Sequence, residues 1–196
     1  MAGTVNSADR RRAIVAAVYR VLERDGLEGA TMRRIAAEAG CTTGSVTHHF
    51  ADRRELLDAT VGAAVEESMA RLVATTRREG LRAGLAEMLP LDGHRRQELA
   101  VWLVGVQAAA RDPELAARLS LRYAAAQDVL VAELHARLSD RADAGAQDAE
   151  ALDLLADEVL SAVDGVAVYA VSDPARYPPE RQLALVDRVL RRTGLA

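Results

Sequence analysis

The stretch Thr31–Phe50, TMRRIAAEAGCTTGSVTHHF, decides the fold of this 196-residue chain. A small apolar stripe predicts a first short helix, and its members are Ile35, Ala36 and Ala39. Gly40 follows this stripe and predicts the end of that helix. Val46 and Phe50 then predict a second short helix with one apolar face. Two short helices joined by a tight turn form a helix-turn-helix pattern.

The outward face of the second helix carries short polar side chains, which suit contacts with base edges and phosphates in a DNA major groove. These residues are Thr43, Gly44, Ser45, Thr47, His48 and His49. Thr31 and Thr42 are predicted N-caps, and each leaves backbone N–H groups that attract an anion, so both are candidate phosphate contacts. Arg33 and Arg34 flank the pattern, either as DNA contacts or as solvated side chains.

The same stretch resembles the DNA-binding signature of the TetR family of bacterial repressors. The matching residues are Ile35, Ala36, Ala37, Glu38, Ala39, Gly40, Thr42, Gly44, Val46, His49, Phe50, Arg53, Leu56 and Leu57. Thr47 stands where the family usually carries a tyrosine that touches a phosphate, and its hydroxyl has a shorter reach. Arg53 stands where the family usually has lysine, so the resemblance implies that Arg53 contacts a DNA phosphate.

Charge is distributed unevenly along the chain, although the net charge is −4. Residues 1–54 hold nine arginines and six acidic residues and therefore carry +3, whereas the remainder carries −7. A basic head attracts phosphates and an acidic body repels them. We expect a DNA-binding domain at residues 7–51, with its helix-turn-helix at 31–50, and a ligand-binding and dimerisation domain at 52–196.

The rest of the chain is expected to be helical as well. Ser7 is a candidate N-cap for a helix that ends at Asp25-Gly26. Later helices are expected at 52–79, 85–89, 95–111, 113–139, 152–171 and 180–192, with a polar loop at 141–148. This makes nine helices with no strand pattern, so the predicted fold class is all-α. Residues 1–6 are expected to form an arm, and the run Arg10–Arg12 is either a DNA contact or a solvated helix end.

The second half of the chain resembles the C-terminal domain of the BetI-like branch of the TetR family. The resemblance is carried by Ala100–Leu103, Arg111–Leu115, Val163–Gly165, Asp173-Pro174 and Tyr177–Arg181. It implies a helical effector and dimerisation domain whose last two helices pair with those of a second copy. These two helices carry more apolar residues than are required to bury one face of each helix within a single chain, which also predicts a homodimer interface. The predicted interface residues are Leu152, Leu155, Val159, Val163, Val166, Leu183, Val186, Val189 and Leu190.

A small-molecule effector site is predicted among the middle helices, because polarizable Met and a few polar groups on apolar walls suit an organic ligand. The candidate residues are Met69, Met88, Trp102, Gln107, Tyr123 and Gln127. Core packing is the alternative interpretation, above all for Trp102, the single tryptophan. Aromatic residues make up only 3% of the chain, and a quaternary-ammonium cage needs several aromatic faces, so choline is not the expected effector.

Patterns typical of enzymes and metal sites are not found in the sequence. His48 and His49 are adjacent and would point about 100° apart on a helix, so they do not suit a shared metal. His94 and His135 have no carboxylate or cysteine partner at ligand spacing. There is no glycine-rich phosphate loop and no nucleophile elbow, and Cys41 in the turn is expected to be a packed residue.

These observations predict a cytoplasmic transcriptional regulator that uses no cofactor and is not an enzyme. Neither a signal peptide nor an apolar run of the roughly 18 residues that a membrane span needs is present. The most specific prediction is a repressor that binds a palindromic double-stranded operator as a homodimer and leaves it when a small organic effector binds. The alternative is a helical protein-interaction scaffold with a degenerate DNA-binding head.

Overall fold

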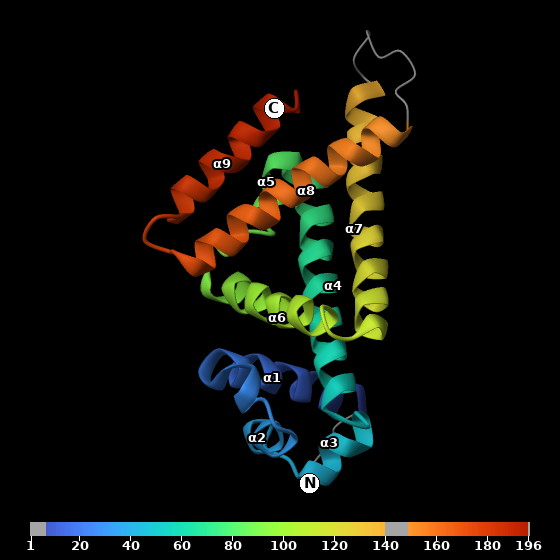
Figure 1. Cartoon of the computed structure of the whole chain (residues 1–196), viewed down its shortest axis with the longest axis vertical. Helices are drawn as coiled ribbons and strands as arrows, with labels where there is room; N and C mark the ends of the chain where they lie inside the picture. Colours follow the sequence, from blue (N-terminus) through green and yellow to red (C-terminus); the bar gives the residue numbers. More distant parts are fainter. Residues whose placement is uncertain (1–6, 140–148, 196) are drawn as a thin grey trace. The chain divides into compact units, whose positions relative to one another are not determined.

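The computed structural model describes residues 7–139 and 149–195, and within these ranges the chain forms nine α-helices and no β-strand (Figure 1). The helices are α1 (Ser7–Gly29), α2 (Met32–Glu38), α3 (Thr43–His49), α4 (Arg53–Glu79), α5 (Leu81–Ala86), α6 (Gly93–Ala109), α7 (Pro113–Ser139), α8 (Ala149–Ser172) and α9 (Pro179–Arg192). This architecture confirms the predicted all-α class. The arm predicted at residues 1–6 and the loop predicted at 141–148 lie outside the described residues.

Local signals in the sequence account for where these helices begin and end. At the start of α7, Asp112 Oδ1 accepts hydrogen bonds from the backbone N–H groups of Glu114 at 3.0 Å and Leu115 at 3.3 Å, with Pro113 at the first helical position. Gly26 has a φ of 64°, so it interrupts α1 at the predicted end of the first helix. The helical turn that follows it continues to Gly29. In the described part of the chain, none of the helices is long and apolar enough to span a membrane.

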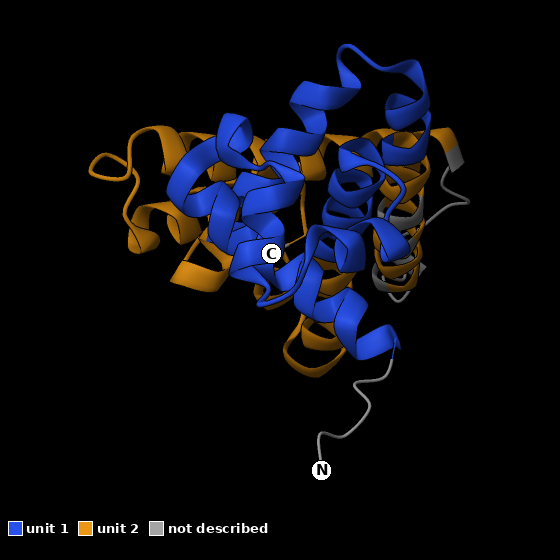
Figure 2. Cartoon of the chain, turned by 90° about the horizontal axis from the view of Figure 1, so that it is seen from below, with its two compact units in different colours: residues 1–65, 97–119 blue, residues 66–96, 120–196 orange. Residues whose placement is uncertain are grey.

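The chain divides into two compact units, which Figure 2 shows in different colours. Unit 1 contains residues 1–65 and 97–119, and unit 2 contains residues 66–96 and 120–196. The first half of α4, most of α6 and the start of α7 therefore group with the head, whereas the sequence placed a boundary between residues 51 and 52. Close packing explains this grouping, since Gln97 Nε2 donates to Glu23 Oε2 at 2.6 Å and Gly105 leaves room for Val61.

Unit 1 has a core to which all three helices of the head contribute. Its fully buried side chains come from α1, α2, α3 and the start of α4, and include Ile14, Val18, Val21, Ile35, Val46, Phe50 and Leu56. The first turn of α4 is capped as predicted, because Asp52 Oδ1 accepts from the Glu55 backbone N–H at 2.8 Å. The Glu55 carboxylate accepts in turn from the Ala51 backbone N–H at 2.7 Å. These bonds fix the direction in which the chain leaves α3.

Unit 2 is organised around α9, which packs against both α8 and α5 (Figure 1). Val186 and Leu190 of α9 are buried, as are Val159 and Val163 of α8. Leu85 of α5 is fully buried as well. At the surface, the guanidinium of Arg82 on α5 pairs with the carboxylate of Asp187 on α9, which ties these two helices together.

Gly84→Ala is expected to destabilise the protein by about 1 to 3 kcal/mol, a typical cost of overpacking a tight core. A Cβ atom at Gly84 would lie 1.8 Å from Thr76 Oγ1 and 2.9 Å from the Leu72 carbonyl oxygen. The carbonyl belongs to the α4 backbone, so α5 would have to move away from α4. Denaturant unfolding of the variant measures the loss. Gly93→Ala is the control, because a Cβ there meets no atom within 4 Å, and equal stability of both variants would contradict the argument.

Candidate DNA-binding interface

Two threonine caps set the starts of α2 and α3. Thr31 Oγ1 accepts a hydrogen bond from the Arg34 backbone N–H at 3.3 Å, and Thr42 Oγ1 accepts one from the Ser45 backbone N–H at 3.1 Å. Both predicted N-caps are therefore confirmed. Both threonines are exposed on unit 1, which leaves them accessible to a ligand. Their predicted phosphate contacts stay predictions.

The turn between α2 and α3 is closed by a Schellman motif. Gly40 has a φ of 63°, its backbone N–H donates to Ala37 O at 3.2 Å, and the Cys41 backbone N–H donates to Ala36 O at 2.9 Å. Glycine adopts this backbone conformation without the steric cost that a Cβ would add. Cys41 is half-buried beside the motif. The motif fixes the angle at which the chain passes from α2 into α3.

The inner face of α3 is anchored in the core of the head. Val46 and Phe50 have no exposed surface, and the Phe50 backbone N–H donates to Val46 O at 2.9 Å. The guanidinium carbon of Arg11 lies 4.5 Å from the centre of the Phe50 ring, within range of a cation–π contact. One arginine of the run Arg10–Arg12 therefore packs against the core of the head.

The outer face of α3 carries the residues that the sequence predicted to read DNA. Four of the six are exposed, namely Thr43, Gly44, Thr47 and His48, and two are half-buried, Ser45 and His49. The Thr47 hydroxyl donates to the Gly44 carbonyl oxygen at 3.2 Å, so its proton is engaged within the helix. The rings of His48 and His49 meet edge to face with their centres 5.2 Å apart. All six candidates thus lie on one seven-residue helix.

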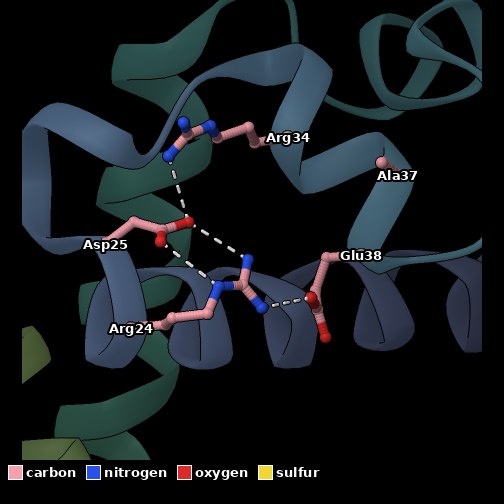
Figure 3. A pocket seen from close by; sticks show the side chains of 5 residues that line it. All are labelled: Arg24, Asp25, Arg34, Ala37 and Glu38. Atoms are coloured by element: carbon pink, nitrogen blue, oxygen red, sulfur yellow. Dashed lines mark hydrogen bonds and ion pairs between the residues drawn. The ribbon is translucent and has the colours of Figure 1, made fainter.

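Arg34, a predicted DNA contact, belongs to an ion-pair network between α1 and α2 (Figure 3). Its Nη1 lies 3.2 Å from Asp25 Oδ2, and Arg24 pairs with both Asp25 at 3.1 Å and Glu38 at 2.9 Å. Arg20 also binds Glu38, at 2.6 Å. Hydrogen bonds from Arg24 hold the pKa of the Asp25 carboxyl below its usual range, and those from Arg20 and Arg24 do the same for Glu38. The network therefore stays charged at neutral pH and joins α2 to α1.

Arg53 and Arg54 are neighbours in the first turn of α4 but bind different partners. Arg53 donates to two backbone carbonyls, Leu27 O in the last turn of α1 and Ala30 O on the connection to α2. Arg54 pairs with Asp112 at 2.7 Å and Glu114 at 2.7 Å, at the start of α7. The sequence analysis predicted a phosphate contact for Arg53 and missed these partners, because no local pattern indicates a contact between residues so far apart in the chain.

A second network in unit 1 extends from Arg54. Arg118 on α7 donates to Asp58 Oδ2 at 2.9 Å and to Glu114 Oε1 at 2.5 Å. Hydrogen bonds from Arg54 and then from Arg118 lower the pKa of the Glu114 carboxyl. The charge of Arg54 is thus balanced by acidic side chains within its own unit. Like the Arg53 contacts, this network joins helices that are distant in sequence.

The six predicted effector residues are divided between the two units. Met69, Met88, Tyr123 and Gln127 belong to unit 2, and Trp102 and Gln107 belong to unit 1. Trp102 is half-buried on α6, and Gln107, near the end of the same helix, is exposed. Gln107 borders a pocket of about 360 Å³ in unit 1 with Ala108, Arg111 and residues 25–28. Binding of an effector at these six positions stays a prediction.

The nine residues predicted for a dimer interface differ in burial within a single copy. Six are buried against their own chain, namely Leu152, Val159, Val163, Val166, Val186 and Leu190. Three are half-buried and keep surface for a partner, namely Leu155, Leu183 and Val189. The more exposed apolar side chains on α8 are Leu154, at 63% exposure, and Tyr169, at 59%. The sequence analysis did not select these two.

Glu98 stands four residues after His94 on α6, so the two side chains are one helical turn apart. The prediction that His94 has no carboxylate partner at ligand spacing is therefore wrong. The spacing between His94 and Glu98 is one at which two side chains on a helix can share a ligand. Neither residue had been assigned a role from the sequence.

Two family models match the chain. The model of bacterial regulatory proteins of the tetR family matches residues 14–60, and the model of the BetI-type transcriptional repressor C-terminal domain matches residues 77–194. Among characterised relatives, the transcriptional regulator PksA of Bacillus subtilis (strain 168) is 28% identical over 184 residues, which cover 90% of this chain and 86% of PksA. The transcriptional repressor AcnR of Corynebacterium efficiens is 31% identical over 135 residues, which cover 69% of this chain and 67% of AcnR.

Solved structures show the same fold over nearly the whole chain. A transcriptional regulator from Rhodococcus sp. Rha1 is similar with a TM-score of 0.78 and 29% identity, covering 93% of this chain and 95% of that one. A regulator from Saccharomonospora viridis in complex with choline has a TM-score of 0.80 and 20% identity, covering 94% of this chain and 96% of that one. With the capped helix-turn-helix and the BetI-type second half, these findings show that the chain belongs to the TetR family of bacterial transcriptional regulators, which bind DNA and are not enzymes.

Proposed function

We propose that this regulator is a repressor that binds a palindromic operator as a homodimer and is released from it by a small organic effector. The observation that carries the proposal is the arrangement of α3, whose inner residues Val46 and Phe50 are fully buried while Thr43 and His48 face outward. A helix held this firmly presents its polar face at a fixed angle, as a major-groove reader requires. Operator binding places the protein in the bacterial cytoplasm.

The proposed dimer forms through the exposed face of α8 and the adjoining part of α9. Leu154 and Tyr169 are exposed apolar side chains on α8, and the Tyr169 ring stacks on the Tyr177 ring with 5.5 Å between their centres. Leu183 and Val189 of α9 are half-buried in the single copy. Large apolar side chains that stay exposed in one copy favour burial against another. A symmetric dimer fits a palindromic operator when its two recognition helices stand roughly 34 to 36 Å apart, one turn of DNA.

The proposed effector is a small organic molecule, and the six predicted residues on the middle helices remain the candidates for binding it. One structural relative was solved in complex with choline. This chain has only 3% aromatic residues, which favours a ligand other than a quaternary ammonium compound. A coupling of about 1 to 3 kcal/mol between the effector and DNA would change operator affinity roughly 5- to 150-fold. Operator affinity measured across a panel of small organic ligands tests this part of the proposal.

Ser45→Ala and His48→Ala are expected to change which half-site bases the protein prefers. Each side chain lies on α3, and a good base contact contributes about 1 to 3 kcal/mol of discrimination against the wrong base. Affinities for a panel of single-base operator variants measure the effect. Ser120→Ala on α7 is the control for a serine hydroxyl outside the head. If both Ser45→Ala and His48→Ala keep the wild-type base preference, as the control does, α3 does not read the bases.

The scaffold with a degenerate DNA-binding head remains the second candidate, and the exposed apolar face of α8 is the observation that favours it. A scaffold would use this face for another protein and would show no preference among DNA sequences. Selection from random DNA therefore separates the two candidates, because only a repressor with a functional head enriches a particular site.

A further inference from the structure

Arg53 joins the two ends of the helix-turn-helix. It is the first residue of α4, immediately after the segment that leaves α3, and its Nε donates to the Ala30 carbonyl oxygen at 2.8 Å. Its Nη2 donates to the Leu27 carbonyl oxygen at 2.5 Å. Ala30 directly precedes Thr31, the N-cap of α2. The pair of hydrogen bonds, which we name the Arg53 clasp, therefore encloses residues 31–52, and these residues contain both α2 and α3.

One of the two carbonyls in the clasp, Ala30 O, is not satisfied by helical bonding, whereas Leu27 O also accepts from the Ala30 backbone N–H at 3.2 Å. The first carbonyl of α2 to accept a helical bond belongs to Thr31, which receives the Ile35 backbone N–H at 2.9 Å. The Ala30 carbonyl lies one residue earlier, and the Ala30 side chain is fully buried. A carbonyl in such a position needs a donor from elsewhere in the chain. Arg53 supplies this donor, and because the donor is charged the hydrogen bond is stronger than one between neutral groups.

The ion-pair network of α1 and α2 contacts the same part of the chain at Asp25. Arg34 on α2 reaches back to the Asp25 carboxylate at 3.2 Å, and Arg24 binds that carboxylate at 3.1 Å (Figure 3). Side chains from α2 and from α4 thus hold the segment between Asp25 and Ala30. The segment acts as a common anchor for the start of α2 and the exit from α3.

We propose that Arg53 is a positioning residue for DNA recognition, which holds α3 in its reading orientation through the Arg53 clasp. This inference rests on the proposed operator binding. It differs from the phosphate contact that the family resemblance implies, because two of the five guanidinium N–H donors are already used within the protein. A phosphate contact requires only a positive charge at this point. A clasp requires two donors at different places along the side chain.

Lysine separates these two roles. An ammonium group keeps the positive charge but places all its donors at a single point, so it does not replace the forked pair of Nε and Nη2. If Arg53 positions α3, Arg53→Lys should resemble Arg53→Ala. If Arg53 contacts a phosphate, Arg53→Lys should bind the operator like the wild type, and only Arg53→Ala should flatten the salt dependence, by about one unit. Arg54→Lys is the matched control, since a lysine can still pair with Asp112 and Glu114.

The first measurement is amide hydrogen exchange of the full chain without DNA. Amides of α2 and α3 should exchange roughly tenfold faster in Arg53→Lys than in the wild type or in Arg54→Lys, because a hydrogen bond to a charged group typically contributes a factor of this size. Exchange at wild-type rates in Arg53→Lys would overturn the clasp. This result does not depend on DNA, so it stays informative even if the proposed operator binding fails.

The second measurement is operator affinity between about 50 and 200 mM salt, the range in which phosphate contacts are most visible. Arg53→Lys should lose roughly tenfold in affinity at every salt concentration while its salt slope stays equal to that of the wild type. Arg54→Lys should keep both its affinity and its slope. An Arg53→Lys variant that binds the operator as tightly as the wild type would overturn the positioning role and would assign Arg53 to a phosphate.

Discussion

A variant that combines Leu154→Arg with Tyr169→Arg is expected to be monomeric and to lose roughly 100- to 10,000-fold in operator affinity, the range by which a second linked binding unit strengthens the first. Both side chains lie on α8 and are among the most exposed large apolar groups in the described part of the chain, at 63% and 59%. Charges buried at an apolar interface without partners are costly, so they separate the two copies. A monomer offers a single recognition helix to a two-part operator.

Light scattering at micromolar protein concentration measures the oligomeric state, and circular dichroism shows whether the variant keeps its helices. Leu121→Arg is the control, because Leu121 is a 72% exposed leucine on α7 that receives the same charge. The control should remain dimeric and bind the operator normally. A double variant that stays dimeric would contradict the proposed α8 interface. A monomer that binds with wild-type affinity would show that operator binding does not need a dimer.

Asp164→Asn is expected to stabilise the protein by about 3 kcal/mol at pH 7.5 and by well under about 1 kcal/mol near pH 4, as the linkage between pKa and stability requires. Burial raises the pKa of the Asp164 carboxyl on α8 from 3.8 to about 6. The folded state therefore holds this proton more tightly than the unfolded chain does. Stability contributed by this group is complete below about pH 4 and is lost as the pH rises through about 6. Asparagine has a similar shape but no charge, so it removes the cost of the buried carboxylate.

Urea unfolding at pH 4 and pH 7.5, at one fixed protein concentration, compares the variant with the wild type. Asp157→Asn is the matched control, because Asp157 is exposed on the same helix. A gain in stability that is equal at both pH values would show that the raised pKa of Asp164 is not its cause. The absence of a gain at pH 7.5 would show that the folded protein accommodates the carboxylate without cost.

Much of the fold follows from short-range signals in the sequence. The caps at Thr31, Thr42 and Asp112 and the glycines at Gly26 and Gly40 end or begin helices where their backbone chemistry predicts. Each of these signals acts within a few residues, so the sequence alone contains the whole interaction. The recognition helix was recognisable for the same reason, because its caps and its two apolar anchors are local features.

Contacts between residues distant in sequence were not predictable in this way. The predicted DNA contacts of Arg34 and Arg53 stay predictions, and no local pattern indicated that Arg34 binds Asp25 or that Arg53 binds the carbonyls of Leu27 and Ala30. The apolar residues of α8 present a similar difficulty. Hydrophobic spacing shows that Val159 and Val163 must be covered, but it does not show whether their own chain or a second copy covers them.

The most direct test of the proposed function is selection of binding sites from a random duplex DNA library by the wild-type protein. A homodimeric repressor should enrich one inverted repeat whose half-site centres are about one turn of DNA, roughly 10 base pairs, apart. Selection with His48→Ala should enrich a repeat that differs at half-site bases. If the wild-type protein enriches no sequence under conditions in which it is folded and dimeric, the chain does not act as an operator-specific repressor.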